Sequence, residues 1–565
     1  MSHLSRLALR LPANAPHLAV LVVMSLILNF YGITWGLPHV DDWANMSLAP
    51  LKPLSFAKHL LDREPWLFHY PPFHFAVLTL VYAPYVLYLV ATGGLQAPTN
   101  TYPFGLAQPE VSLTVFTLLA RGTSALMGVG LVLVNYLTVR RLYGPRAAFV
   151  SSFLIAASYP IIHFAHNANV DVPYLFWLSL ALYSFVRLID GFQTRWFVLL
   201  ALFTAFAVGT KHTAYALVAG LIPLLLYHHY RAVAERHAGR PPLSALLDRR
   251  FVYAGALCVV TVVLIFNPIL NWKGFLAHVS RHGQISVGGS WIVQTAPGWL
   301  AGHVQLVGQY LDYIRQSTGW PAFVLLAAGF VYAVVRYPKQ SLIVVVPMLT
   351  YYVLYLKNFG TVHLRYMLPV FVLSTWLAGR LAADLLATRA IPRPVPQLVV
   401  AVILGSALLH GYTVNYMYVR DPRYAAEQWI DDQVPRGAKV LAVEPVYALP
   451  RLPRHLDITY RQLWDYNGNQ LADITDVPAD YVVIGMSIPR RAHTEKWRVS
   501  WVKPIDAEGF LSARGYEPVA SFKTPLPVWG AEVPDIHAIN PRVVIWKSRE
   551  PRPTNAQAGL PGRTN

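Results

Sequence analysis

Apolar runs separated by short polar segments fill most of the chain up to residue 418. An α-helix needs about 20 mostly apolar residues to cross a bilayer, and several runs have that length. The pattern predicts a polytopic α-helical membrane protein with about eleven transmembrane helices. The expected helices are residues 18–35, 111–139, 147–164, 172–188, 197–208, 213–227, 251–272, 320–335, 342–356, 367–387 and 398–418. No small-residue cleavage motif follows the first run, so we expect a retained anchor rather than a signal peptide.

Basic residues predict how these helices are oriented. Arg6 and Arg10 precede the first run, and Lys and Arg are enriched in cytoplasmic loops, so we expect a cytoplasmic N-terminus. The apolar run 73–92 is long enough to cross, but a crossing there would place the basic loop 140–146 outside. We therefore predict that residues 73–92, interrupted by Pro84, form an interfacial helix that lies along or dips into the outer face.

The composition changes after residue 419, where the last predicted span ends. Short apolar runs bounded by Pro-rich connections indicate buried strands. The predicted strands are 439–443, 481–484 and 543–546, and a short helix is expected at 424–432. We predict a transmembrane domain at 1–419, a small extracytoplasmic α/β domain at 420–548 and a disordered tail at 549–565.

Composition supports a membrane protein and excludes other classes. The chain is 55% hydrophobic and 13% charged, against about 25% charged residues in soluble domains. Its net charge of +18 is spread over short loops, whereas a nucleic-acid-binding face would gather basic residues on a soluble surface. We therefore expect membrane lipids, and no nucleic acid, as partners. The single cysteine, Cys258, lies in an apolar run, which excludes an intramolecular disulfide and a thiolate zinc site.

Ionisable residues gather in the first predicted outer loop, residues 38–72. Asp41 and Asp42 follow the first span, and Glu64 and His69 come later in the loop. Charged side chains at a membrane face are costly unless they serve a function, so this loop is a candidate site. The structural alternative is an ordinary polar connection between two spans.

The later outer loops bring more ionisable residues to the same face. They are His163, His166, Asp171, Lys211, Lys357 and Arg365. Carboxylates can accept a proton from an attacking hydroxyl, while Lys and Arg bind phosphate at the lipid boundary. A transporter would place such residues near the bilayer midplane, so the pattern favours interfacial chemistry on a phosphate that carries a lipid tail. A transporter or flippase for a lipid-linked or anionic solute stays the alternative.

Some of these residues also have simpler explanations. Asp171 is a good N-cap for the helix that follows it. Lys211 and Arg365 could snorkel to the membrane interface as anchors.

A divalent metal ion is a further candidate ligand in the outer loops. The candidate metal ligands are Glu64, His69, His163 and His166. Imidazoles and carboxylates are ordinary metal ligands, but the spacing of these residues matches no diagnostic motif. We therefore predict no required cofactor.

Six short segments, taken in order along the chain, resemble those of one known family. They are Asp41-Asp42, Tyr70-Pro71-Pro72, Arg121-Gly122-Thr123-Ser124, Asp171, Gly209-Thr210-Lys211 and Arg365-Tyr366-Met367-Leu368-Pro369. They resemble motifs of the GT-C glycosyltransferases, near the protein O-mannosyltransferases and the bacterial aminoarabinose transferases of lipid A. The resemblance covers roughly residues 15 to 490. Asp42 departs from it, because Glu is commoner at that position.

The resemblance implies a GT-C-like enzyme of the bacterial inner membrane that uses a polyprenyl-phosphate sugar. The sugar, a hexose or a pentose, would pass to an extracytoplasmic lipid, glycan or protein by inverting displacement at the anomeric carbon. The resemblance implies that Asp41 is the catalytic base, and Asp42 and Asp171 are further catalytic candidates. The candidates for binding the donor phosphate are Lys211, Arg365, Lys357 and Arg121.

Overall fold

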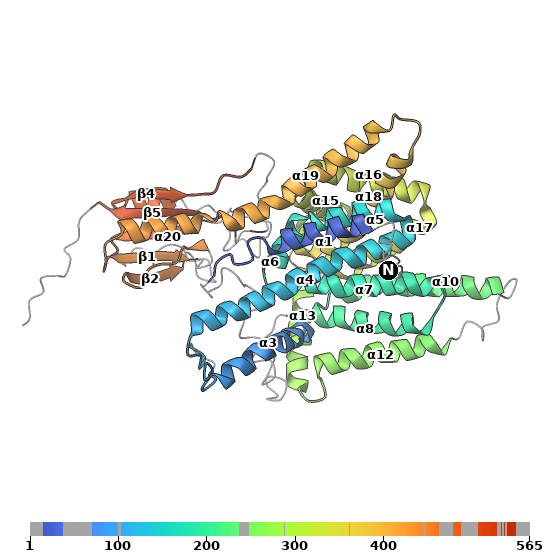
Figure 1. The fold of residues 1–565 in the computed structure, drawn as a ribbon, viewed down its shortest axis with the longest axis horizontal. Coiled ribbons are helices and arrows are strands. Elements are labelled where there is room, and N and C mark those ends of the chain that lie inside the picture. The colour runs from blue at the N-terminus through green and yellow to red at the C-terminus, as the bar shows by residue number, and fades with distance from the viewer. Residues whose placement is uncertain are drawn as a thin grey trace, which may run out of the picture. The chain divides into compact units, whose positions relative to one another are not determined.

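The computed structural model divides the chain into a helical unit and a mixed unit (Figure 1). The main part of the helical unit ends at Tyr416, and the mixed unit continues from Met417. The structure describes residues 15–37, 70–99, 103–236, 248–286, 289–360, 362–444, 448–462, 478–486, 507–527, 533, 536 and 539–549.

The helical unit consists, in its described residues, almost entirely of helices. In its first half they are α1 (Ala15–Phe30), α3 (Phe73–Ala91), α4 (Pro109–Tyr143), α5 (Pro145–Ala156), α6 (Tyr159–His166), α7 (Asp171–Ile189), α8 (Thr194–Thr210), α9 (Ala214–Val218), α10 (Leu221–Arg236) and α12 (Arg249–Phe266). In its second half they are α13 (Trp272–Ser286), α14 (Trp291–Thr295), α15 (Trp299–Thr318), α16 (Trp320–Arg336), α17 (Pro338–Tyr351), η2 (Tyr352–Leu356), η3 (Leu364–Met367), α18 (Leu368–Ala387) and α19 (Pro394–Val419).

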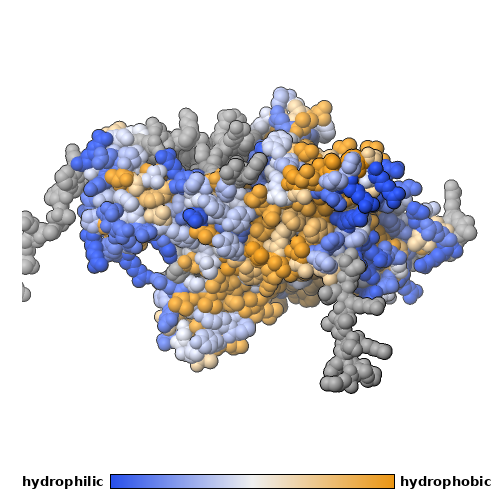
Figure 2. Space-filling model, turned by 45° about the horizontal axis from the view of Figure 1, so that its top comes forward, coloured by the Kyte–Doolittle hydropathy of each residue, from blue (hydrophilic) through white to orange (hydrophobic). Residues whose placement is uncertain are grey.

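Many of these helices are long and apolar enough to cross a membrane. Within the described residues, 8 helices meet this criterion, or up to 9 if α5 and α6, which meet at 56°, form one bent span. The helices α1, α8 and α16 are apolar but shorter. Hydrophobic side chains form a broad band over the helical unit, as Figure 2 shows. The chain is therefore a polytopic helical membrane protein, and the exact number of crossings stays a prediction.

The segment 73–92, which we predict to be interfacial, forms the helix α3. By length and hydropathy α3 could also cross a membrane. Whether it crosses or lies at the interface therefore stays a prediction. The long outer segment expected after residue 272 is largely helical, since it contains α13, α14 and α15.

A buried polar network joins α4, α5 and α18 in the middle of the helical unit. The Asn135 amide donates to Ser151 at 3.0 Å and to Ser152 at 2.9 Å, and it accepts from the Trp376 indole at 2.6 Å. The Ser151 hydroxyl also meets Thr375 at 2.8 Å. In an apolar bundle such side-chain hydrogen bonds between helices specify which faces pack together.

Polar contacts join one group of connecting segments. Arg141 pairs with Asp190 at 2.7 Å, which links the α4–α5 turn to the α7–α8 turn. The guanidinium of Arg250, at the start of α12, donates to the Phe192 carbonyl in that same turn. These are segments that the charge alternation assigns to the cytoplasmic face.

A second group of segments meets separately. The His166 ring lies 2.9 Å from the Tyr31 carbonyl, and Arg365 donates to the Tyr70 hydroxyl at 3.1 Å. These residues belong to segments assigned to the outer face. These contacts thus divide the connecting segments into the same two groups that the distribution of basic residues predicts. The side of the membrane that each group faces stays a prediction.

The mixed unit contains a five-stranded sheet with the order β2-β1-β3-β5-β4. Its elements are α20 (Pro422–Gln433), β1 (Lys439–Glu444), β2 (Asp457–Gln462), β3 (Tyr481–Met486), α22 (Ala507–Ser512), β4 (Tyr516–Phe522) and β5 (Arg542–Ser548). The strands β1, β2 and β3 are parallel, whereas β5 runs antiparallel to β3 and β4. Apolar clusters cover both faces of the sheet, one including α20 and the other α22.

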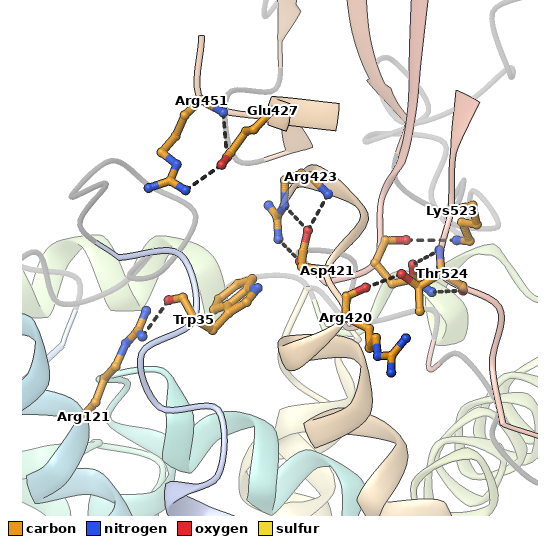
Figure 3. A network of polar contacts seen from close by, with 10 residues as sticks. Trp35, Arg121, Arg420, Asp421, Arg423, Glu427, Arg451, Lys523 and Thr524 are labelled. Carbon is orange, nitrogen blue, oxygen red and sulfur yellow. Dashed lines mark hydrogen bonds and ion pairs between the residues drawn. The ribbon is translucent and has the colours of Figure 1, made fainter. Parts of the chain in front are cut away.

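Buried polar contacts hold the start of α20. The Asp421 carboxylate caps the helix by accepting from the Arg423 backbone N–H at 2.9 Å, and it pairs with the Arg423 guanidinium at 2.6 Å (Figure 3). Both side chains are fully buried. Further along α20, Glu427 pairs with Arg451 at 2.5 Å. The cap and the ion pairs fix where α20 begins and how it is held within this unit.

Candidate functional site

A buried ion pair joins the start of α7 to the end of α8. The Lys211 ammonium donates to Oδ1 of Asp171, and the two side chains are 4% and 0% exposed. The Asn169 side chain accepts the Asp171 backbone N–H at 3.0 Å, which begins α7. Asp171 in the first turn of one helix and Lys211 after the last turn of another both suit the helix dipoles. The second carboxylate oxygen of Asp171 is buried and has no hydrogen-bond partner among the residues that the structure describes.

Arg365 lies beside this pair. It is half-buried, it donates to the Tyr70 hydroxyl at 3.1 Å, and its charge is close enough to act on Lys211. The ring of Tyr366 lies 5.6 Å from Nζ of Lys211 and 5.6 Å from Cζ of Arg365. The structure therefore brings together three predicted site residues, Asp171, Lys211 and Arg365, from three distant parts of the chain.

Buried side chains also hold the segment just before the first predicted outer loop, at residues 28–35. Arg121 of α4 donates to the carbonyl of Trp35 at 2.8 Å (Figure 3). It also donates to the carbonyl of Ile33 at 2.5 Å. Asn415 of α19 donates to two further carbonyls in this segment, each at 2.8 Å. Fixed carbonyls restrict where the loop can start, so Arg121 positions this segment. Its predicted phosphate contact stays a prediction.

The two acids that follow this segment, Asp41 and Asp42, lie outside the described residues, as do Glu64 and His69. Their predicted roles therefore stay predictions. The described residues before this loop end at Leu37, only a few residues before Asp41. Arg121 and Asn415 consequently anchor the backbone directly upstream of the predicted base.

The remaining metal candidates have protein partners. Both ring nitrogens of His166 face backbone carbonyls, those of Ile162 at 2.8 Å and Tyr31 at 2.9 Å. The His163 ring lies 3.0 Å from the Asn167 amide. Among the described residues, no group of three or more His, Cys, Asp or Glu side chains could hold a metal ion. His166 is thus engaged in orienting the segment after α1, and the metal assignment stays a prediction.

Lys357 follows a short π-helical turn, η2, that continues α17. Its carbonyl accepts the Ser290 N–H at 2.8 Å, and its ammonium makes no hydrogen bond or ion pair with any described residue. The structure shows no contact between this ammonium and the Asp171–Lys211 pair among the described residues. A π-helical turn often marks a functional site.

The sequence analysis did not single out a set of buried tyrosines near the pair. They are Tyr174, Tyr310, Tyr351, Tyr355 and Tyr366. Two signals could have revealed them. Tyr174 follows Asp171 at a spacing that places both on one helix face, and Tyr366 adjoins Arg365.

A family model described as dolichyl-phosphate-mannose-protein mannosyltransferase matches residues 114–272. This range includes Arg121, Asp171 and Lys211, but it ends before Arg365. No curated protein matches the chain. The family match agrees with the resemblance that the motifs predict, and the chain is similar to the GT-C glycosyltransferases.

Some solved structures are similar to this chain at low sequence identity. An oligosaccharyltransferase from Archaeoglobus fulgidus, in complex with zinc and sulfate, is 14% identical with a TM-score of 0.41, covering 76% of this chain and 60% of its own. ArnT from Cupriavidus metallidurans, bound to undecaprenyl phosphate, is 15% identical with a TM-score of 0.40. The match covers 93% of this chain and 97% of ArnT. The protein O-mannosyltransferase Pmt1-Pmt2 complex from S. cerevisiae, bound to the sugar donor, is 15% identical with a TM-score of 0.31, covering 49% and 34%. This chain thus spans less than two thirds of the archaeal and yeast proteins.

Proposed function

We propose that the chain is a membrane glycosyltransferase that moves a sugar from a polyprenyl-phosphate donor to an acceptor at the outer membrane face. The observation that carries the proposal is the buried Asp171–Lys211 pair with Arg365 beside it. Buried ionisable groups in a membrane protein are costly and mark substrate sites by default. The family match over residues 114–272 includes both members of the pair.

Lys211 and Arg365 would bind the donor phosphate. An ammonium binds phosphate as a point charge and a guanidinium binds it through paired N–H groups, so the two side chains complement each other. The surrounding helices are apolar, which suits a lipid tail. Lys357 and Arg121 are further phosphate candidates, although Arg121 also holds the carbonyls of residues 33 and 35.

Transfer would proceed by direct displacement, with Asp41 as the base. The acceptor hydroxyl oxygen forms a bond to the anomeric carbon, and the bond from that carbon to the phosphate oxygen breaks. The bonding electron pair leaves with the lipid phosphate, and the hydroxyl proton passes to the Asp41 carboxylate. The cations on the phosphate would stabilise the negative charge that develops on the leaving group. Asp42 and Asp171 are the further catalytic candidates.

Binding of undecaprenyl phosphate to the purified full-length protein in lipid nanodiscs tests the proposal, with undecaprenol as the control ligand. We expect the phosphate form to bind at least about tenfold more tightly, because hydrogen bonds to charged groups are worth about 1.5–3 kcal/mol. Lys211→Met and Arg365→Gln should reduce this preference. Equal binding of both lipids would contradict the proposal, and solute transport without phosphate-lipid binding would support the transporter alternative.

Mass analysis of cell-envelope glycans in a deletion strain would identify the sugar and its acceptor. We expect one sugar to disappear from one acceptor class and to return when the intact gene is restored. An unchanged glycan profile under conditions of expression would count against a glycosyltransferase.

A further inference from the structure

We infer that the Tyr366 ring is a positioning element that holds both Lys211 and Arg365 in place for the donor phosphate. This inference rests on the proposed function, because it assumes that these two cations bind the donor phosphate.

One aromatic ring, that of Tyr366, lies close to both cations. Nζ of Lys211 and Cζ of Arg365 each lie 5.6 Å from the centre of the Tyr366 ring. The centre of a second ring, that of Tyr174, lies 5.7 Å from Nζ of Lys211. Cations within about 6 Å of an aromatic ring are attracted to the negative face of the ring, most strongly where water is excluded. The Tyr366 side chain is 5% exposed, so its contacts are largely desolvated.

The two cations would otherwise separate. Arg365 acts unfavourably on the charged form of Lys211, because like charges repel. Asp171 attracts Lys211 toward the start of α7, and the Tyr70 hydroxyl holds Arg365 from another side. An aromatic ring attracts both cations without neutralising either one, so both charges stay available to an anion. A carboxylate in the place of the ring would compete with the phosphate.

The ring itself is held firmly. Its backbone carbonyl accepts the Tyr351 hydroxyl at 3.0 Å. Its face and edges pack against Tyr355 at 5.5 Å, Phe359 at 5.1 Å and His363 at 5.3 Å between ring centres. These residues lie in or near the π-helical turn after α17. The irregular end of this helix therefore holds the Tyr366 ring, and the ring in turn positions the two cations. Precise support of this kind is what a preorganised binding site requires.

Three substitutions separate the attraction of the ring for cations from its packing. Tyr366→Leu removes the ring, Tyr366→Phe keeps it, and Phe359→Leu removes a neighbouring buried ring that makes no cation contact among the described residues. The measurement is the binding of undecaprenyl phosphate and of undecaprenol to each full-length variant in nanodiscs. We expect Tyr366→Leu to weaken phosphate-lipid binding about tenfold or more, since it removes the attraction of two desolvated cations to the ring. Tyr366→Phe should stay within about threefold of the unchanged protein. Phe359→Leu should weaken binding less than Tyr366→Leu does, because it loosens the support of the ring and keeps both cation contacts, and undecaprenol binding should not change in any variant.

A shape-conserving replacement guards against misfolding of the leucine variant. Incorporating trifluorophenylalanine at position 366 keeps the ring but withdraws the negative charge from its face, so phosphate-lipid binding should weaken relative to Tyr366→Phe. The same replacement at Phe359 should have no effect. A merely structural role for the ring would make the two positions behave alike.

A double variant tests whether the ring acts through the cations. In a Lys211→Met, Arg365→Gln background, the additional change Tyr366→Leu should weaken binding by less than about threefold. An undiminished effect there, or equal binding by Tyr366→Leu and Phe359→Leu, overturns the inference and leaves the proposed function intact. Failure of the unchanged protein to prefer the phosphate lipid overturns both.

Discussion

Ion pairs occur in both groups of connecting segments of the helical unit, and they differ in exposure. Lys211 and Asp171 are 4% and 0% exposed, whereas Arg141 and Asp190 are 53% and 37% exposed. An exposed pair contributes about 0–1 kcal/mol and costs little to form. A buried pair loses the hydration of both charges, and this loss can exceed the attraction between them. The exposed pair of Arg141 and Asp190 therefore has a sufficient structural explanation. The buried pair of Lys211 and Asp171 calls for a functional one.

The first test asks whether the two groups of segments face opposite sides of the membrane. Single cysteines at positions 100 and 144, in a background where the only cysteine is replaced by Cys258→Ser, should label from opposite sides. We expect position 100 to react with a membrane-impermeant reagent added outside, and position 144 to react only after permeabilisation. Labelling of position 144 from outside, with position 100 protected until permeabilisation, would mean that α3 crosses the membrane.

The next largest effect should come from the predicted base in the first outer loop. Asn keeps the size of Asp but cannot accept the proton, so Asp41→Asn should lower turnover by about 10²- to 10⁴-fold. Undecaprenyl phosphate should bind this variant as tightly as it binds the unchanged protein. Asp42→Asn is the matched control and should lower turnover less. Full turnover by a folded Asp41→Asn protein would remove Asp41 as the base, and Asp42 and Asp171 would be tested next.

Replacing one acid in each pair measures the difference between the two pairs directly. Asp171→Asn leaves the Lys211 charge buried, so we expect the free energy of unfolding in detergent to fall by about 3–5 kcal/mol. Asp190→Asn leaves only an exposed Arg141, and the expected change is below about 1 kcal/mol. Chemical denaturation of both variants, followed by circular dichroism, provides the comparison. Similar changes in the two variants would show that burial does not distinguish the pairs.

The smallest effect concerns pH and the segment before α12. Side-chain hydrogen bonds from Arg250 lower the pKa of Asp248 below its ordinary value of 3.8. Because the folded pKa is the lower one, the pair stabilises the protein above the ordinary pKa, and this contribution is lost as the pH falls through the lowered value. Unfolding measured between about pH 5 and about pH 2 should therefore show a small loss of stability that Asp248→Asn reduces. An equal pH dependence of stability in the unchanged protein and in Asp248→Asn would mean that other acids cause the loss of stability at low pH.

Strand prediction succeeded where strands are buried on both faces. The predicted strands 439–443, 481–484 and 543–546 lie within β1, β3 and β5, the three central strands of the sheet. Such strands are nearly continuous apolar runs, which a sequence reveals directly. The edge strands β2 and β4 were not predicted, because their exposed positions carry polar residues. The outer placement of this unit stays a prediction.

Prediction of the site residues also succeeded only for features that can be read from neighbouring residues in the sequence. The sequence identified Asp171, Lys211 and Arg365 as candidate site residues, because each is ionisable and lies near the end of an apolar run. A charge at such a position is costly, and the apolar run that makes it costly is visible in the neighbouring residues. The sequence also assigned Arg121 to phosphate, which stays a prediction, but it could not reveal that Arg121 donates to the carbonyls of Ile33 and Trp35.

The sequence by itself determined the helical membrane class, the apolar segments, the central strands and the types of ionisable residue near the outer loops. The pairing of Asp171 with Lys211, 40 residues away, and the contact of Arg365 with Tyr70, 295 residues away, became apparent only in the folded chain. The same holds for the Tyr366 ring, which lies 5.6 Å from each of the two cations. Hydrophobic length is a property of consecutive residues, whereas these contacts depend on which helix faces pack together, and that choice is made by side chains distributed over the whole bundle.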